Sequence, residues 1–304
     1  MMRRRTPLLL LTLAAGVLAA CTTGGPPGGG GTLPPPVDNS AGSLTDPANL
    51  PLGDYHVSTT TPGVGSIFVC STAGGGGGAG VAGPWIHVNG TWDSTTKIAV
   101  QGSVAWPTAN VTITEAAGRR TIAGNSLPDH TTGIFPIQPS DPAYRYDTNP
   151  NSISAHAVSV SLTMSPTVAA QPSCLPMGPI GYALNGVPIY DGLDALSRDA
   201  VAHEVQDACD GHPSPGGYHY HSASACMPGV GNATPTLLAY ARDGFGIYNS
   251  VDEHGVELTN NDLDVCHGRT SPVPWNGSTQ SVYHYVATDA YPYAVGCFRG
   301  TPGA

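Results

Sequence analysis

The chain has 304 residues, with 11 Lys and Arg against 21 Asp and Glu and a formal net charge of -10 at pH 7. Only 11% of its residues are charged, whereas 40 are Gly and 29 are Pro. This acidic balance argues against a nucleic-acid partner, because proteins that bind phosphate backbones gather Lys and Arg on one face.

The N-terminus has the pattern of an export signal. Three arginines at 3–5 precede an apolar run over 8–18, which is followed by Leu18-Ala19-Ala20-Cys21. That tetrapeptide is similar to a bacterial lipobox, in which the cysteine after the cleavage site is lipidated. The apolar run is too short to span a membrane. We therefore expect a lipoprotein signal peptide at 1–20 and an exported protein of the cell envelope, anchored to a bacterial membrane by lipid on Cys21.

The next segment, 21–50, is rich in Gly and Pro and nearly lacks aliphatic residues. Such a composition buries too little apolar surface to offset the entropy of ordering, and it is typical of a disordered tether. The remaining chain, 51–304, is long enough for one large core or two smaller ones.

This body has the sequence pattern of a mostly β fold. Short runs of Val, Ile, Thr and aromatic residues, bounded by Gly, Pro and Asn, predict strands. A helix is expected at 194–208, where Ala residues are frequent. We predict a single β-rich sandwich or barrel-like body with one short helix. The expected strands are 66–71, 85–89, 97–106, 110–115, 153–164 and 181–190.

The C-terminal half contains an internal duplication. Four blocks recur in the same order, and two copies of one supersecondary unit usually pack against each other. We expect the copies to be related by a pseudo-twofold axis. The matched pairs are 181–190 with 239–248, 207–211 with 264–268, 218–221 with 283–286, and Cys226 with Cys297.

The segment Tyr218-His219-Tyr220-His221 indicates a metal site. In an extended strand the two histidines share one face, with Cα atoms about 6.5 to 7 Å apart, so both imidazoles can reach one metal ion. Tyr218 and Tyr220 then occupy the other face, and we expect them to pack in the core. The second copy has His284, but Val286 in place of the second histidine. If both arms approach the axis, three imidazoles meet and form a copper or zinc site. The alternative is a strand with one buried face and two surface histidines.

Another histidine, His212, precedes this segment and follows Cys209-Asp210-Gly211. We expect it on a loop near the tetrapeptide, as a further metal ligand, as a partner of a ligand, or as a plain loop histidine. A reaction is not assigned, because Glu204 and Asp210 could act as acid or base but nothing in the sequence positions them.

The cysteine count predicts disulfides. Six cysteines remain after Cys21, and an even number in an exported protein favours three bridges with fifteen possible pairings. The duplication selects one pairing, in which each copy has its own bridge. The predicted bridges are Cys209 with Cys226, Cys266 with Cys297, and Cys70 with Cys174.

The region at about 125–300 contains a series of ordered blocks at 129–136, 186–190, 209–212, 218–221, 243–248, 263–268, 283–285 and 291–297. With these blocks it resembles the YHYH family of exported proteins. The resemblance implies export and a histidine-rich site, and it implies no particular activity.

Two other functions compete with transition-metal binding. Tryptophans could stack on sugars in a glycan-binding or cell-wall-binding module, although most tryptophans are buried. Acidic loops at 191–194 and 260–264 could bind calcium, although neither has the spacing of an EF-hand loop and both could form simple turns. The tryptophans are Trp85, Trp92, Trp106 and Trp275.

Overall fold

The structure is a computed structural model that describes residues 33–72 and 77–303. The predicted signal peptide, Cys21 and residues 22–32 lie outside the described residues. Within the described part no helix is long and apolar enough to cross a membrane. Residues 33–50 lie mostly on the surface, with backbone hydrogen bonds from Val37 to Asp54 (3.1 Å) and from Ser43 to Asn49 (2.8 Å).

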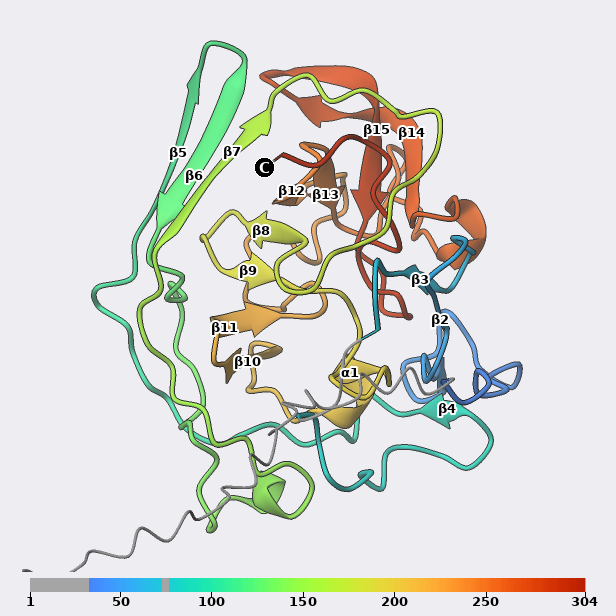
Figure 1. Ribbon diagram of the computed structural model, residues 1–304, viewed down its shortest axis with the longest axis vertical. Coiled ribbons are helices and arrows are strands. Elements are labelled where there is room, and N and C mark those ends of the chain that lie inside the picture. The colour runs from blue at the N-terminus through green and yellow to red at the C-terminus, as the bar shows by residue number, and fades with distance from the viewer. Residues whose placement is uncertain (1–32, 73–76, 304) are drawn as a thin grey trace, which may run out of the picture. The chain divides into compact units, whose positions relative to one another are not determined.

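The mostly β prediction is confirmed. The largest sheet of the described residues has eight strands and is open, so no closed barrel forms. Figure 1 shows this sheet running through the centre of the body. Its strands, in spatial order, are β10 (Gly211–Ser214), β11 (Gly217–Tyr220), β9 (Pro188–Ile189), β8 (Gly181–Ala183), β12 (Leu237–Ala241), β13 (Gly246–Tyr248), β15 (Ser278–Val286) and β14 (Gly268–Trp275).

The sheet carries the predicted duplication in its hydrogen-bonding pattern. At its centre β8 and β12 pair antiparallel, and Tyr182 lies opposite Tyr240, its match in the repeat. Moving outward, β9 pairs in parallel with β11 as β13 does with β15. Each half ends in an antiparallel hairpin, β10–β11 or β14–β15. The pseudo-twofold axis therefore passes between the two central strands.

The remaining strands form three small sheets. A three-stranded antiparallel sheet packs through Ile122, Val160 and Leu162 against Tyr240 and Trp275 of the large sheet, which gives a sandwich-like pair of layers (Figure 1). The expected strands at 85–89 and 97–106 form only isolated bridges. The small sheets are β5 (Val111–Ala116), β6 (Arg119–Gly124) and β7 (Val158–Thr163); β1 (Leu50–Pro51) with β4 (Thr91–Trp92); and β2 (Val57–Ser58) with β3 (Ile67–Phe68).

A helix does form within the expected range 194–208, but it is much shorter than predicted. The only α-helix among the described residues, α1 (Ala200–His203), has one turn, beside two 3-10 turns at Pro142–Arg145 and Asn260–Asp262. Upstream, Ser197 has φ of 61° and cannot be helical. Asp199 caps the helix by accepting from the backbone N–H of Ala202, and Glu204 leaves it with extended backbone.

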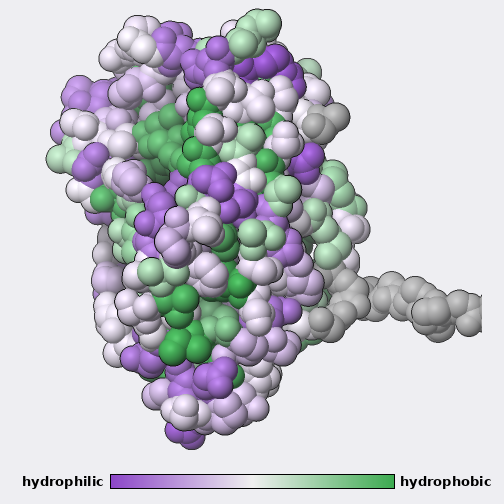
Figure 2. Space-filling view, turned by 90° about the vertical axis from the view of Figure 1, so that its left-hand side faces the viewer, coloured by the Kyte–Doolittle hydropathy of each residue, from purple (hydrophilic) through white to green (hydrophobic). Residues whose placement is uncertain are grey.

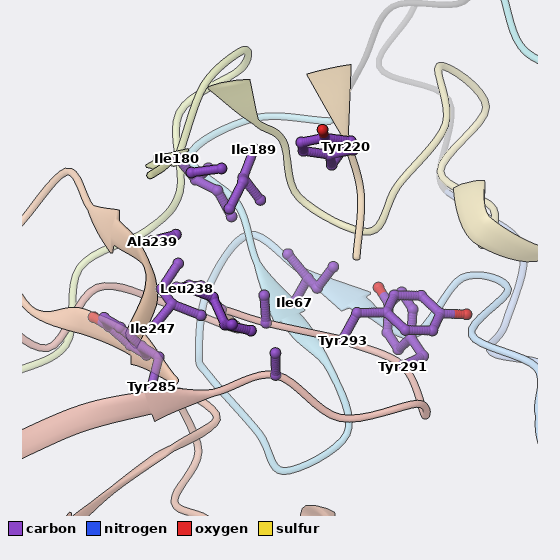
Figure 3. Close-up of a cluster of buried hydrophobic side chains, with 14 of the residues drawn as sticks. Ile67, Ile180, Ile189, Tyr220, Leu238, Ala239, Ile247, Tyr285, Tyr291 and Tyr293 are labelled. Atoms are coloured by element: carbon purple, nitrogen blue, oxygen red, sulfur yellow. The ribbon is translucent and has the colours of Figure 1, made fainter. Parts of the chain in front are cut away.

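The main core lies where both copies meet the N-terminal strands. Figure 3 shows Ile180 with Ile189 from the first copy and Ile247 with Tyr285 from the second. Tyr218 and Tyr220 are fully buried, as predicted from strand alternation. On the face shown in Figure 2, hydrophobic residues are interspersed with polar ones.

All three predicted disulfides are present: Cys70–Cys174, Cys209–Cys226 and Cys266–Cys297. Each copy of the repeat thus has its own bridge. The remaining bridge, Cys70–Cys174, joins the chain just after β3 to the segment before the first copy and holds the N-terminal part against the duplicated sheet.

Candidate metal centre

The β10–β11 hairpin brings three histidines to one face. A turn at Pro215-Gly216 connects the strands, and His212 lies directly opposite His219 in the register. Directly opposed residues point to the same side of a sheet, with Cβ atoms about 4.5 to 5.5 Å apart. His221 lies two residues beyond His219 and therefore shares that face. All three side chains are at most 4% exposed.

The ring nitrogens of His219 and His221 face each other. Their Nε2 atoms are 3.2 Å apart. The Nδ1–H of His219 donates to the Gly217 carbonyl at 3.1 Å, and the Nδ1–H of His221 donates to the Asp191 carbonyl. With each proton fixed on Nδ1, each Nε2 carries a lone pair, and the two lone pairs point toward each other. Carbonyl partners of this kind orient metal-ligating imidazoles in proteins.

Glu204 lies against two of the three histidines. Its Oε2 lies 3.4 Å from His212 Nε2 and 3.5 Å from His221 Nε2. This oxygen and both ring nitrogens of His212 are buried without a hydrogen-bond partner among the described residues. Such orphaned polar atoms cost about 1 to 3 kcal/mol each, so a native structure requires an explanation for them.

Burial sets the charge states of the cluster. It lowers the pKa of His219 to about 3 and of His221 to about 4, and it lowers that of His212 well below 6.5. The imidazoles are therefore neutral at physiological pH, which is the state that binds metals. Burial also raises the pKa of Glu204 well above 4.5, with smaller contributions from Asp194 and Asp147.

These distances fit a tetrahedral ion. Ligands 2.0 to 2.1 Å from a tetrahedral centre lie about 3.3 to 3.4 Å from one another, whereas adjacent ligands of a square-planar ion lie about 2.8 to 3.0 Å apart. Three of the six separations among the four donors, 3.2, 3.4 and 3.5 Å, are close to the tetrahedral values. The donor atoms of the three histidines all lie within 4.8 Å of one another. Three imidazole nitrogens and one carboxylate oxygen suit zinc best.

The cluster borders a cavity of about 620 Å³, and all four donor residues line it. Tyr190 also lines it and stacks on His219, with ring centroids 4.1 Å apart and planes inclined by 27°. Burial raises the pKa of Tyr190 above 10, so its hydroxyl is neutral. Asp191, on the same wall, has its pKa raised by burial to about 7.

The expectation that His284 joins this cluster is wrong. His284 lies on β15, five strand positions from β11, which corresponds to about 24 Å at the usual strand spacing. The two arms sit at opposite ends of the sheet because the axis runs through the β8–β12 pair (Figure 1). His284 donates from Nδ1 to the Val282 carbonyl and packs edge-on against Tyr248.

The repeat explains why only one half has the cluster. The residue equivalent to His212 is Arg269, opposite His284, and Val286 occupies the place of His221. The sequence predicted a meeting of three histidines with His284 as the third, whereas the structure places His212 of the same hairpin there. The signal that identifies His212 is the Ser214-Pro215-Gly216-Gly217 turn, which pairs the residues on either side of it.

Glu204 was considered only as an unplaced acid or base. No motif reveals its position as a ligand, because a one-turn helix and long-range packing bring it to the hairpin. A second group, His130 with Cys209 and Cys226, also has ligand spacing, but its sulfurs form a disulfide.

The residues considered for glycan or calcium binding are buried or engaged in structural contacts. Trp85, Trp92 and Trp275 are at most 6% exposed. In the acidic loops, Asp194 pairs with Arg198, and Asp262 accepts from the Thr259 backbone.

Comparison with known proteins gives one match. The family described as YHYH protein matches residues 159–254, a segment that includes β8 to β13 and the whole cluster. No curated protein and no solved structure matches the chain.

Proposed function

We propose that this chain, which belongs to the YHYH family, binds one transition-metal ion, zinc or copper, through His212, His219, His221 and Glu204. The donor set of imidazoles and one carboxylate favours zinc, and three of the donor separations are close to those around a tetrahedral ion. Copper remains the chief competitor, since it outranks zinc in affinity for most nitrogen and oxygen ligand sets.

One observation carries the proposal. The Nε2 atoms of His219 and His221 face each other at 3.2 Å with no proton between them, while both Nδ1 atoms are held by carbonyls. Two facing lone pairs in a buried site repel each other. A cation between them turns this repulsion into coordination and also gives a partner to His212 Nε2 and Glu204 Oε2.

The export signal, the lipobox-like sequence and the three disulfides support a location outside the cytoplasm, with the body held to a membrane by lipid on Cys21. In that compartment the disulfides persist, and their cysteines do not compete for the metal.

The repeat provides a matched control for the test. Protein purified from its oxidising compartment, stripped of metal and reloaded with Zn²⁺ or Cu²⁺, is expected to hold one ion per chain by elemental analysis. His219→Ala should abolish this binding, whereas His284→Ala, the equivalent change in the second copy, should leave it intact. Equal metal content in the two variants, or no metal in the parent protein, would refute the proposal.

A further inference from the structure

The proposed centre has four protein donors and borders a cavity that is partly open to the surface. Another molecule can approach a metal ion next to such a space, as it does in exchangeable and catalytic sites. Here the four donor residues form part of the wall of the cavity of about 620 Å³. A small organic molecule in this cavity would lie next to the ion.

The charged side chains of the cavity wall are all acidic. Among the described residues that line it there is no Lys and no Arg, but there are four carboxylates, of Asp147, Asp191, Asp194 and Glu204. Asp194 is neutralised by Arg198, with Nη2 and Oδ2 2.6 Å apart. Apart from the ion itself, the described wall therefore offers no positive charge that would attract an anion.

Two of the remaining carboxylates are already engaged. Asp147 accepts from the backbone N–H groups of Val205 and Asn149, and Glu204 belongs to the proposed centre. Asp191 accepts one hydrogen bond, from Leu193 N–H to Oδ1, and forms no ion pair within the described part of the chain. Its backbone carbonyl accepts from His221, and the residue lines the cavity next to the proposed centre.

The rest of the wall is largely apolar. Val69, Leu193 and three prolines line it, and Met177, which is 66% exposed, lies at its edge. A ligand that matches both features carries a positive charge at one end and a short hydrocarbon chain at the other.

Building on the metal centre proposed above, we infer that the cavity takes a small aliphatic amine, whose charge is recognised by Asp191, and that it discriminates against anions of the same size. Asp191 acts as a specificity-determining residue, and the apolar wall receives the hydrocarbon chain. The metal ion forms the end of the cavity that adjoins the β10–β11 hairpin.

The test uses the full chain loaded with Co²⁺, whose visible absorption changes when its surroundings change. Three probes of equal length, n-butylamine, n-butanol and butyrate, are titrated at pH 8.5, where butylamine is a cation and butyrate an anion. Butylamine is expected to bind at least tenfold more tightly than butyrate, with butanol between them. Asp191→Asn should abolish this preference, since the amide can still accept from Leu193.

Glu257→Gln serves as the charge-matched control, because Glu257 is exposed and lies outside the cavity lining. It should keep the preference for butylamine. Failure of the chain to bind Co²⁺ would overturn the metal proposal itself. Normal Co²⁺ binding with no response to any probe, equal or tighter binding of butyrate, or an unchanged preference in Asp191→Asn would overturn this inference while leaving the metal centre standing.

Discussion

Zinc binding at pH 6 is expected to release about one proton, and that proton should come from Glu204. The free protein holds His219 and His221 neutral at this pH, because burial lowers their pKa values to about 3 and about 4. His212 is neutral for the same reason. Burial raises the pKa of Glu204 well above 4.5, which favours the protonated carboxyl, and the metal must displace that proton.

An exposed site would behave differently. Three solvated imidazoles with ordinary pKa values near 6.5 would each be about three-quarters protonated at pH 6, and would together release about two protons. A solvated glutamate would release almost none. The proton count therefore distinguishes the buried cluster from a surface histidine site with the same residues.

The assay is calorimetric titration with Zn²⁺ in two buffers of different ionisation enthalpy, for the parent protein and for Glu204→Gln. The difference in heat gives the number of protons released. We expect about one proton for the parent and close to zero for the variant, which should also bind more weakly because it lacks a charged ligand. Release of two or more protons, or an equal count in both proteins, would refute the assigned charge states.

Two further predictions concern stability in the metal-free protein. His267 is buried with a pKa lowered to about 3, so the unfolded chain gains a proton below pH 6.5 that the folded chain does not. The substitution His267→Asn is compatible with the local φ of 68°, because Asn tolerates positive φ. It should reduce the loss of unfolding free energy between pH 7 and pH 5 by about 2 kcal/mol, as measured by urea titrations. An unchanged loss would contradict this. Replacing Cys70 and Cys174, which are 104 residues apart, with Ser should lower the free energy of unfolding by about 4.7 kcal/mol. The same change at Cys209 and Cys226, which are 17 residues apart, should lower it by about 3 kcal/mol. Guanidinium unfolding measures both values, and the reverse order would contradict the argument from loop length.

Local patterns in the sequence were enough to predict much of the fold. Strand alternation correctly placed Tyr218 and Tyr220 in the core and His219 and His221 on the other face. The duplication predicted the disulfide pairing, because equivalent cysteines occupy equivalent places in the two copies. Both inferences depend on neighbours along the chain or on an exact repeat.

The remaining features depend on contacts that the sequence does not encode locally. The pseudo-twofold axis was expected, but its position between β8 and β12 was not, and this position separates His284 from His219. The helix expected at 194–208 is interrupted by the positive φ of Ser197, which composition does not reveal. Glu204 reaches the histidines only through the packing of α1 against the hairpin.

The central claim is that three imidazoles and one carboxylate of the first copy converge on a single ion. X-ray absorption spectroscopy of the zinc-loaded protein tests this claim most directly, because imidazole rings give characteristic outer-shell scattering. We predict four nitrogen or oxygen neighbours at about 2.0 to 2.1 Å, three of them imidazoles. A spectrum with one imidazole or none, or with six oxygen neighbours, would contradict the account.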